Sequence, residues 1–288
     1  MVIRILDSYR GVRPLDTLGF SARQLEEVRA ALAKPFGIIL ISGPTGSGKT
    51  TTLYAMLSEL DREHRNVVSL EDPIEYNVPS MNQSQVFPEI GYTFASGLRS
   101  ILRQDPDIIM VGEIRDAETA ELAIQAALTG HLVLSTLHTN NAAGVVPRLV
   151  DMGIDPYLIA PVLILCIAQR LARITCPSSR KIADDQEALR QMAAQSFADL
   201  PPEFSTKLPQ GDFTQAVPSA ECPSGTRGRV AVFEMYETDK DLQALILKKP
   251  TDVDIYNLVR SKGFLTMKEN AILKCIQGEI PFQEIYNL

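Results

Sequence analysis

The sequence predicts an α/β fold in which a parallel β-sheet is flanked by helices, with a small helical appendage at the C-terminal end. Two observations predict this class. Short apolar runs alternate with helix-length segments over the first half of the chain, and the connections between them are short. In addition, a glycine-rich loop at residues 43–50 joins one apolar run to a helix pattern.

The elements are expected in the following order. Strand-like runs lie at 2–6, 36–42, 67–70, 107–111, 132–137 and 228–236, and helix patterns lie at 21–33, 51–60, 94–103 and 117–128. The apolar stretch 154–171 is interpreted as a core-packed helix. Residues 184–217 are polar and suggest a helix followed by a loose loop. Three further helical segments, 239–249, 252–262 and 267–277, are expected to form the C-terminal bundle.

Composition is that of a globular protein with a sizeable core. Of its 288 residues, 45% are hydrophobic and 22% are charged. The net charge of −7 gives no global basic field, so we expect no nucleic acid as partner. No apolar stretch reaches membrane-spanning length, and the chain does not open as a signal peptide, so direct membrane insertion is not expected.

The cysteines are few and irregularly spaced. This pattern fits a reducing cytosol better than a disulfide framework. The four positions are Cys166, Cys176, Cys222 and Cys275.

The glycine-rich loop has the composition of a phosphate-binding loop (P-loop). Its glycines let the backbone curl so that N–H groups point at phosphate oxygens, and the following helix adds a favourable partial charge. Lys49 supplies a mobile charge for the β- and γ-phosphates, and the Thr50 hydroxyl can ligate Mg²⁺. We therefore expect a bound nucleoside triphosphate. Its expected contacts are Gly43, Thr45, Gly46, Ser47, Gly48, Lys49, Thr50 and Thr51.

An acid follows the strand expected at 107–111. Ligands of α/β sheets bind at the C-terminal edge of the strands, and nucleotide hydrolysis needs a carboxylate there for the Mg²⁺ shell. Glu113 is therefore the expected partner of Thr50 at the metal, acting through water.

A second acidic cluster follows the strand expected at 67–70. Pro73 restricts Asp72 to extended geometry, which places the acids at a strand end. Hydrolysis needs a carboxylate within hydrogen-bond reach of the attacking water. Glu71 is the first candidate for this base and Glu75 is the second, while a solvated acidic turn stays open as the alternative.

Two histidines bracket the strand expected at 132–137. His131 and His138 lie at opposite ends of it and cannot chelate one metal together. His138 is placed to sense the γ-phosphate or to orient the acids. An ordinary hydrogen-bonded imidazole remains the alternative for both histidines.

Two arginines lie four residues apart within the segment 94–103. Arg99 and Arg103 should share one helix face. Either guanidinium could reach a γ-phosphate across a subunit boundary, an effect worth about 10³–10⁵ in rate. A surface ion pair is the alternative role.

Four blocks in a fixed order, at residues 43–54, 69–76, 98–131 and 134–149, resemble the ATPases of type II secretion and type IV pilus assembly. That family calls them the Walker A, Asp, Walker B and His boxes. The resemblance covers most of residues 1–175 and is weaker over 225–288. It implies a RecA-like P-loop core that hydrolyses ATP to ADP with Mg²⁺.

The resemblance also implies partners and roles. It implies a hexameric ring in the cytoplasm, peripheral at the inner membrane, that drives a membrane platform protein and polymerises pilin-like subunits. In the family, the equivalents of Glu71, Glu113 and His138 serve hydrolysis. The phosphate-facing arginines would be Arg4, Arg99, Arg103 and one of Arg227 and Arg229.

Two departures from the family pattern shape the expected organisation. Members carry N-terminal domains, so residues 1–20 are interpreted as the last strand and linker of a missing domain, ahead of a core at 21–175. Assembly members also hold zinc with two Cys-x-x-Cys pairs, but here Ser179 and Gly225 stand at the second position of each pair. We expect no zinc site in this degenerate insertion at 176–226, because structural zinc needs four ligands. Strands and the helical bundle follow at 227–288.

Three other functions are alternatives to an assembly motor. A pilus retraction motor or a conjugation-type secretion ATPase is the near alternative, although retraction motors are expected to lack the insertion. A nucleotide-gated scaffold without turnover would not need Glu71, Glu113 and His138. A nucleic-acid translocase would need a basic pore lining, which no Lys/Arg cluster suggests.

Overall fold

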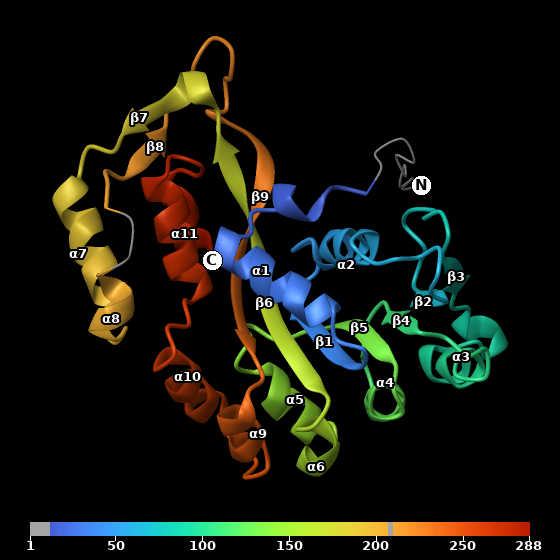
Figure 1. Ribbon diagram of the computed structural model, residues 1–288. Coiled ribbons are helices and arrows are strands. Elements are labelled where there is room, and N and C mark those ends of the chain that lie inside the picture. The colour runs from blue at the N-terminus through green and yellow to red at the C-terminus, as the bar shows by residue number, and fades with distance from the viewer. Residues whose placement is uncertain (1–11, 207–209) are drawn as a thin grey trace.

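A seven-stranded mixed sheet forms the centre of the computed structural model, which describes residues 12–206 and 210–288 (Figure 1). Its strand order is β3-β2-β4-β5-β1-β6-β9. The pairings are parallel except that of β9 with β6, which is antiparallel. The strands are β1 (Gly37–Ser42), β2 (Val67–Glu71), β3 (Asn82–Gln85), β4 (Ile108–Val111), β5 (Leu132–Leu137), β6 (Leu163–Thr175) and β9 (Thr226–Glu237).

The central strands are buried on both faces, as a parallel sheet covered by helices requires. Successive side chains of a strand point to opposite faces. In β1, Ile38 and Leu40 therefore enter one hydrophobic core, and Ile39 and Ile41 enter the other. Residues 38–41 are all apolar because alternate side chains fill different cores on the two faces of the sheet. The predicted fold class is confirmed.

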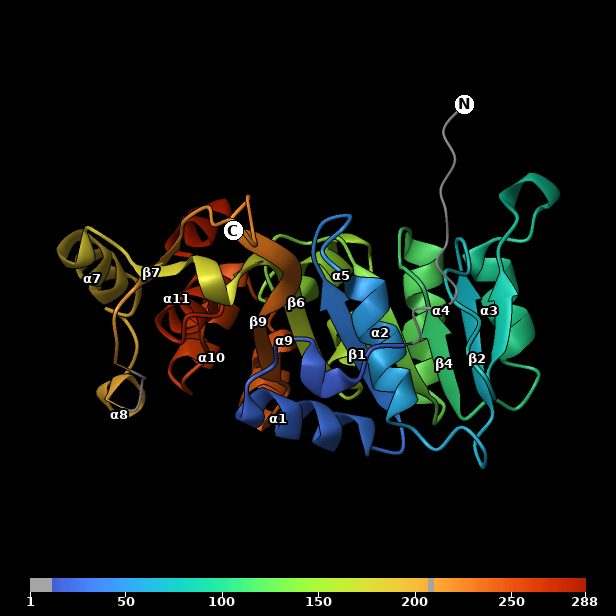
Figure 2. The ribbon, with the colours of Figure 1, turned by 90° about the horizontal axis from the view of Figure 1, so that it is seen from above.

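Helices cover the two faces. The face with α1 (Ala22–Leu32) and α2 (Lys49–Ser58) is seen in Figure 2. The opposite face carries α3 (Phe94–Ile101), α4 (Ala117–Leu128), α5 (Val145–Asp151), α6 (Pro156–Ile159), α9 (Lys240–Ile246) and α10 (Asp252–Arg260). Local signals define several helix starts: Ser21 and Gln24 form a capping box, and Asp116 caps α4.

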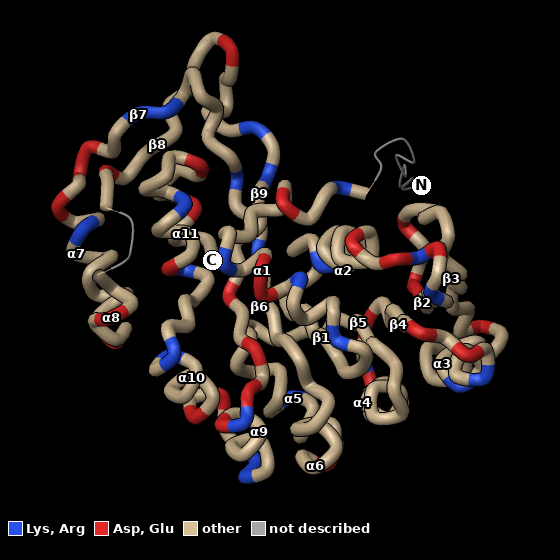
Figure 3. The backbone as a smooth tube through the Cα atoms, viewed as in Figure 1, with Lys and Arg blue, Asp and Glu red and all other residues tan. Residues whose placement is uncertain are grey.

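A third core lies beyond the main sheet. There α11 (Met267–Ile276) packs against the outer halves of β6 and β9 and against α7 (Gln186–Ser196). The remaining elements of this region are β7 (Arg180–Ile182), α8 (Pro202–Ser205) and β8 (Thr214–Ala216), which stand apart from the main sheet in Figure 1. Acidic and basic residues are interspersed along α9, α10 and α11 (Figure 3).

Most expected elements are confirmed with small differences at their ends, but the helix expected at 154–171 is wrong. Only residues 156–159 are helical there, and β6 begins at Leu163. An apolar run is compatible with a buried strand or a buried helix, and pairing with β1 and β9 decides in favour of the strand.

Other elements carry weak sequence signals. The edge strand β3 is polar, and α5 lies inside the segment that follows the histidines. The loose loop expected before residue 217 contains α8 and β8, which pairs with β7. The strand expected at 2–6 lies outside the described residues. Over the described ranges, the longest helices are too short or too polar to cross a membrane.

Candidate nucleotide-binding site

A cleft of about 690 Å³ opens at the C-terminal edge of the sheet, where β1, β2, β4 and β5 end. The predicted phosphate loop, acids and histidine meet there. Its polar lining consists of Thr45, Lys49, Thr50, Thr51, Glu71, Asp72, Glu75, Glu113, Arg115, Thr136, His138 and Arg229, together with Gly46 and Gly48.

The loop between β1 and α2 depends on its glycines. Gly43, Gly46 and Gly48 have φ values of 144°, 81° and 89°, a region that side-chain-bearing residues rarely adopt. A Cβ on Gly43 would also lie 2.6 Å from the backbone oxygen of Gln169. The loop therefore forms a concave turn directly before the N-terminus of α2, the geometry that phosphate groups favour.

Lys49 crosses the concavity of this loop. Its Nζ donates hydrogen bonds to the backbone oxygens of Gly43 at 2.8 Å and Pro44 at 3.1 Å. Burial lowers the pKa of Lys49, and the negative charge of Glu113 partly opposes that shift. The ammonium is thus held over the loop, opposite the acid expected at the metal, so the residues present fit a triphosphate with Mg²⁺.

Gln169 on β6 supports the loop and was missed by sequence reasoning. It is 1% exposed, and its Nε2 donates to the backbone oxygen of Ser47 at 2.6 Å. The only sequence signal is a polar residue inside an otherwise apolar run, which does not reveal the partner.

Glu113 lies between two cationic or ionisable side chains. Arg115 forms an ion pair with it, and His138 Nε2 lies 3.2 Å from its Oε2. Burial alone would raise the pKa of Glu113, but Arg115 and then His138 outweigh burial, so its pKa is lowered. Glu113 is therefore present as a carboxylate, in the form that a metal shell needs.

Arg115 is a second site residue that sequence reasoning missed. Its guanidinium also approaches Asp72 at 3.3 Å and so connects the ends of β4 and β2. The pKa of Arg115 is raised, chiefly by its hydrogen bond to Glu113. Its position two residues after Glu113 was the available signal.

Glu71 borders the cleft, but its carboxylate points away from solvent. The residue is 2% exposed and accepts hydrogen bonds from Tyr54, Ser69 and Gln83. Glu75, the second candidate for the base, also lines the cleft and is half-buried.

The remaining predicted residues divide into two groups. Arg229, on β9, lines the cleft, whereas Arg99 and Arg103 do not. Arg99 forms an exposed ion pair with Glu118, and Arg103 follows the end of α3. His131 is bonded to the backbone oxygen of Ala126 at 2.8 Å. Arg4 lies outside the described residues.

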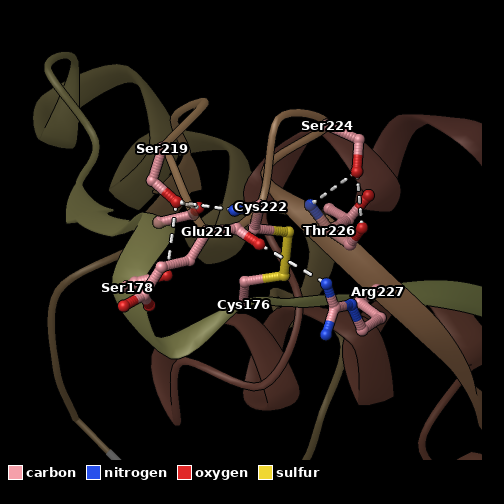
Figure 4. Close-up of a disulfide and its surroundings, with 9 residues drawn as sticks. Cys176, Ser178, Ser219, Glu221, Cys222, Ser224, Thr226 and Arg227 are labelled. Atoms are coloured by element: carbon pink, nitrogen blue, oxygen red, sulfur yellow. Dashed lines mark hydrogen bonds between the residues drawn. A yellow bond between two sulfur atoms is a disulfide. The ribbon is translucent and has the colours of Figure 1, made fainter.

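The segment 176–226, expected to be an insertion, contains a disulfide between Cys176 and Cys222 (Figure 4). The sparse cysteine pattern was expected to fit a reducing cytosol better than a disulfide framework, and the pairing of Cys176 with Cys222 differs from that expectation. Cys166 and Cys275 are free and buried. The two cysteines are 46 residues apart in sequence, and only the pairing of β6 with β9 brings their segments together. Local sequence patterns therefore could not predict the disulfide.

Ser179 and Gly225, which stand where the second cysteine of each pair would be, make hydrogen bonds instead. Ser179 hydrogen-bonds to Ser219 at 2.9 Å, and the backbone oxygen of Gly225 accepts from the Cys176 N–H at 3.0 Å. Over residues 12–206 and 210–288, no group of three or more His, Cys, Asp or Glu side chains is arranged to hold a metal ion.

A phosphate loop after β1, with acids at the ends of β2 and β4, defines the class of P-loop nucleotide-binding proteins. Within this class, the chain belongs to the type II/IV secretion system protein family, whose model matches residues 1–287. It is 42% identical to type II secretion system protein E of Pseudomonas aeruginosa, over 99% of this chain and 55% of that protein. It is 43% identical to the type IV pilus assembly ATPase PilB of Myxococcus xanthus, over 99% of this chain and 49% of PilB. The chain thus spans about half the length of these curated relatives.

Solved structures of ATPases share the fold. The pilus retraction motor PilT with bound ADP is 28% identical, with a TM-score of 0.69 over 96% of this chain and 67% of PilT. The Legionella pneumophila ATPase DotB is 26% identical, with a TM-score of 0.67 over 96% of this chain and 64% of DotB.

Proposed function

We propose that this chain is the ATP-hydrolysing part of a motor that assembles pilin-like subunits in type IV pilus biogenesis or type II secretion. The observation that carries the proposal is the meeting of Lys49, Glu113 and His138 in one cleft. Identities of 42–43% to secretion protein E and to the pilus assembly ATPase PilB support a role in assembly.

In this proposal the loop amides and Lys49 bind the β- and γ-phosphates of ATP. Thr50 and, through water, Glu113 would hold Mg²⁺, which would neutralise charge on the phosphates. The contact of Glu113 with His138 would keep the Glu113 carboxylate oriented toward the metal. A second cavity of about 410 Å³ adjoins the cleft and shares Gly48, Thr51, Leu171 and Arg229 with it, so it can take the nucleoside.

The partners form part of the same proposal. A hexameric ring would let Arg99 and Arg103, which lie outside the cleft of their own chain, face a neighbouring nucleotide. The ring would act in the cytoplasm on an inner-membrane platform protein. Light scattering with and without Mg·ATP tests the ring, since a constant monomer mass would contradict it.

The test of activity is phosphate release by the wild type and by Lys49→Ala, with Lys34→Ala as an exposed control. We expect turnover that is lost in Lys49→Ala, retained in Lys34→Ala and abolished by chelating Mg²⁺. Tight ATP binding without phosphate release would instead support the nucleotide-gated scaffold.

A further inference from the structure

The carboxylate of Glu71 is enclosed by three side-chain donors. Ser69 Oγ lies 2.6 Å from its Oε1, Gln83 Nε2 lies 3.0 Å from the same oxygen, and the Tyr54 hydroxyl bonds to its Oε2. Glu71 is 2% exposed, so an attacking water cannot reach it in this conformation. Glu71, the first candidate for the general base, is therefore held away from the attacking water.

Tyr54 connects this carboxylate to the phosphate loop. It lies on α2, the helix that begins at Lys49, and it is 1% exposed. Burial, and then the hydrogen bond to Glu71, raise the pKa of Tyr54, so its phenol keeps the proton and acts as the donor. Any shift of α2 that accompanies phosphate binding at its N-terminus therefore moves the Tyr54 hydroxyl relative to Glu71.

Gln83 connects the same carboxylate to the acidic segment that follows it. Its Nε2 also donates to the backbone oxygen of Tyr76 at 2.9 Å, and its Oε1 accepts from the Val78 N–H at 2.7 Å. The Tyr76 ring packs edge-on against Tyr54, with centroids 5.6 Å apart. Glu71, α2 and the segment 72–81 thus share one hydrogen-bonded cluster at the border of the cleft.

We propose that Tyr54 is a positioning residue that holds Glu71 withdrawn and releases it to the attacking water when a triphosphate engages the N-terminus of α2. The inference rests on the proposed ATPase function. The role proposed for Tyr54 differs from a purely structural one, because turnover requires the hydrogen bond between Tyr54 and Glu71 to break rather than to persist.

The first test is Tyr54→Phe, which removes the hydroxyl and keeps the ring packed on Tyr76. Loss of one of three hydrogen bonds to a charged group should raise kcat about 10- to 100-fold, with KM for ATP changed less than about twofold. Tyr256→Phe is the matched control, because Tyr256 donates to the Asp199 carboxylate at 2.6 Å, away from the cleft. Its kcat should equal that of the wild type. An unchanged or lowered kcat in Tyr54→Phe overturns the proposal.

The second test observes the hydrogen bond directly. The chain has eight tyrosines and no tryptophan, so tyrosine emission can be measured without interference. A phenol bonded to a carboxylate emits weakly. A non-hydrolysable ATP analogue with Mg²⁺ should therefore raise the emission of the wild type and of Tyr256→Phe, but not that of Tyr54→Phe.

Calorimetry with the same analogue separates the two possible failures. Binding without a change in emission overturns the release of Glu71 and leaves the ATPase proposal standing. No binding, together with equal phosphate release by wild type and Lys49→Ala, overturns the ATPase proposal and the release that depends on it.

Discussion

His138 Nε2 lies 3.2 Å from Glu113 Oε2, a contact that joins the end of β5 to the end of β4 across the cleft. The two strands are neighbours, with Val111 in register with Ser135. The parallel pairing therefore brings the two side chains, 25 residues apart, to the same edge. This contact supports the proposal that His138 orients the acid expected at the metal.

Replacing His138 should impair turnover without unfolding the protein. In His138→Ala the carboxylate of Glu113 loses one of its two oriented partners, and we expect phosphate release to fall about 10- to 100-fold. His131→Ala is the control, because His131 bonds to the end of α4 and does not line the cleft. Equal turnover in both variants would contradict a role for His138.

Removing Arg115 should change the pH dependence of ATP hydrolysis. Glu113 works as a carboxylate, so activity is lost as pH falls through its pKa. Arg115 is the largest influence that lowers this pKa against burial. In Arg115→Gln that influence is lost, so the pKa of Glu113 should rise and the acid limb of kcat/KM should move to higher pH. Arg190→Gln, which breaks an exposed pair with Asp212, should leave the limb in place. An unmoved limb in Arg115→Gln would show that the ion pair does not control Glu113.

Gln169→Leu should weaken nucleotide binding through the phosphate loop. Leucine keeps most of the volume but leaves the backbone oxygen of Ser47 without its donor, at a cost of about 1–3 kcal/mol. We expect ATP affinity measured by calorimetry to fall about tenfold, with lower thermal stability. Gln125→Leu, at an exposed site on α4, should change neither quantity. Wild-type affinity in Gln169→Leu would argue against support of the loop by β6.

Reduction of the Cys176–Cys222 disulfide should destabilise the segment 176–226. The bond spans 46 residues, for which the chain-entropy model gives about 4 kcal/mol. Protein purified without reductant should therefore melt at a lower temperature after reduction, whereas the melting of Cys222→Ser should not respond to reductant. Alkylation under denaturing conditions should label two cysteines before reduction and four after it. Four labels without reductant would rule out the disulfide.

The buried Arg260 joins the segment 176–226 to the C-terminal helices, through Asp199 and Glu269. Its guanidinium bonds to both carboxylate oxygens of Glu269, at 2.8 and 2.5 Å, and to Asp199 at 2.6 Å. Because Glu269 is 1% exposed, Arg260→Met would leave a buried charge unpaired and should cost about 3–5 kcal/mol in unfolding free energy. Arg190→Ala, at an exposed pair, should cost less than about 1 kcal/mol by the same denaturant titration.

Sequence alone predicted the features that depend on near neighbours along the chain. The φ values required of Gly43, Gly46 and Gly48 follow from the loop motif, and the apolar run of β1 follows from burial on both faces. The acids and His138 were located because parallel strands all end at one edge of the sheet. Fold class, phosphate loop and most elements could therefore be predicted.

Tertiary structure decided the features whose partners lie far away in sequence. Gln169 reaches Ser47 across 122 residues, and Cys176 reaches Cys222 only because β6 and β9 pair. The same pairing made residues 163–171 a strand rather than a helix. Whether the Glu71 carboxylate faces the cleft or turns inward depends on donors from α2 and β3. Local pattern restricts backbone conformation over a few residues, but the choice among long-range partners is made when the sheet assembles and buries its two faces.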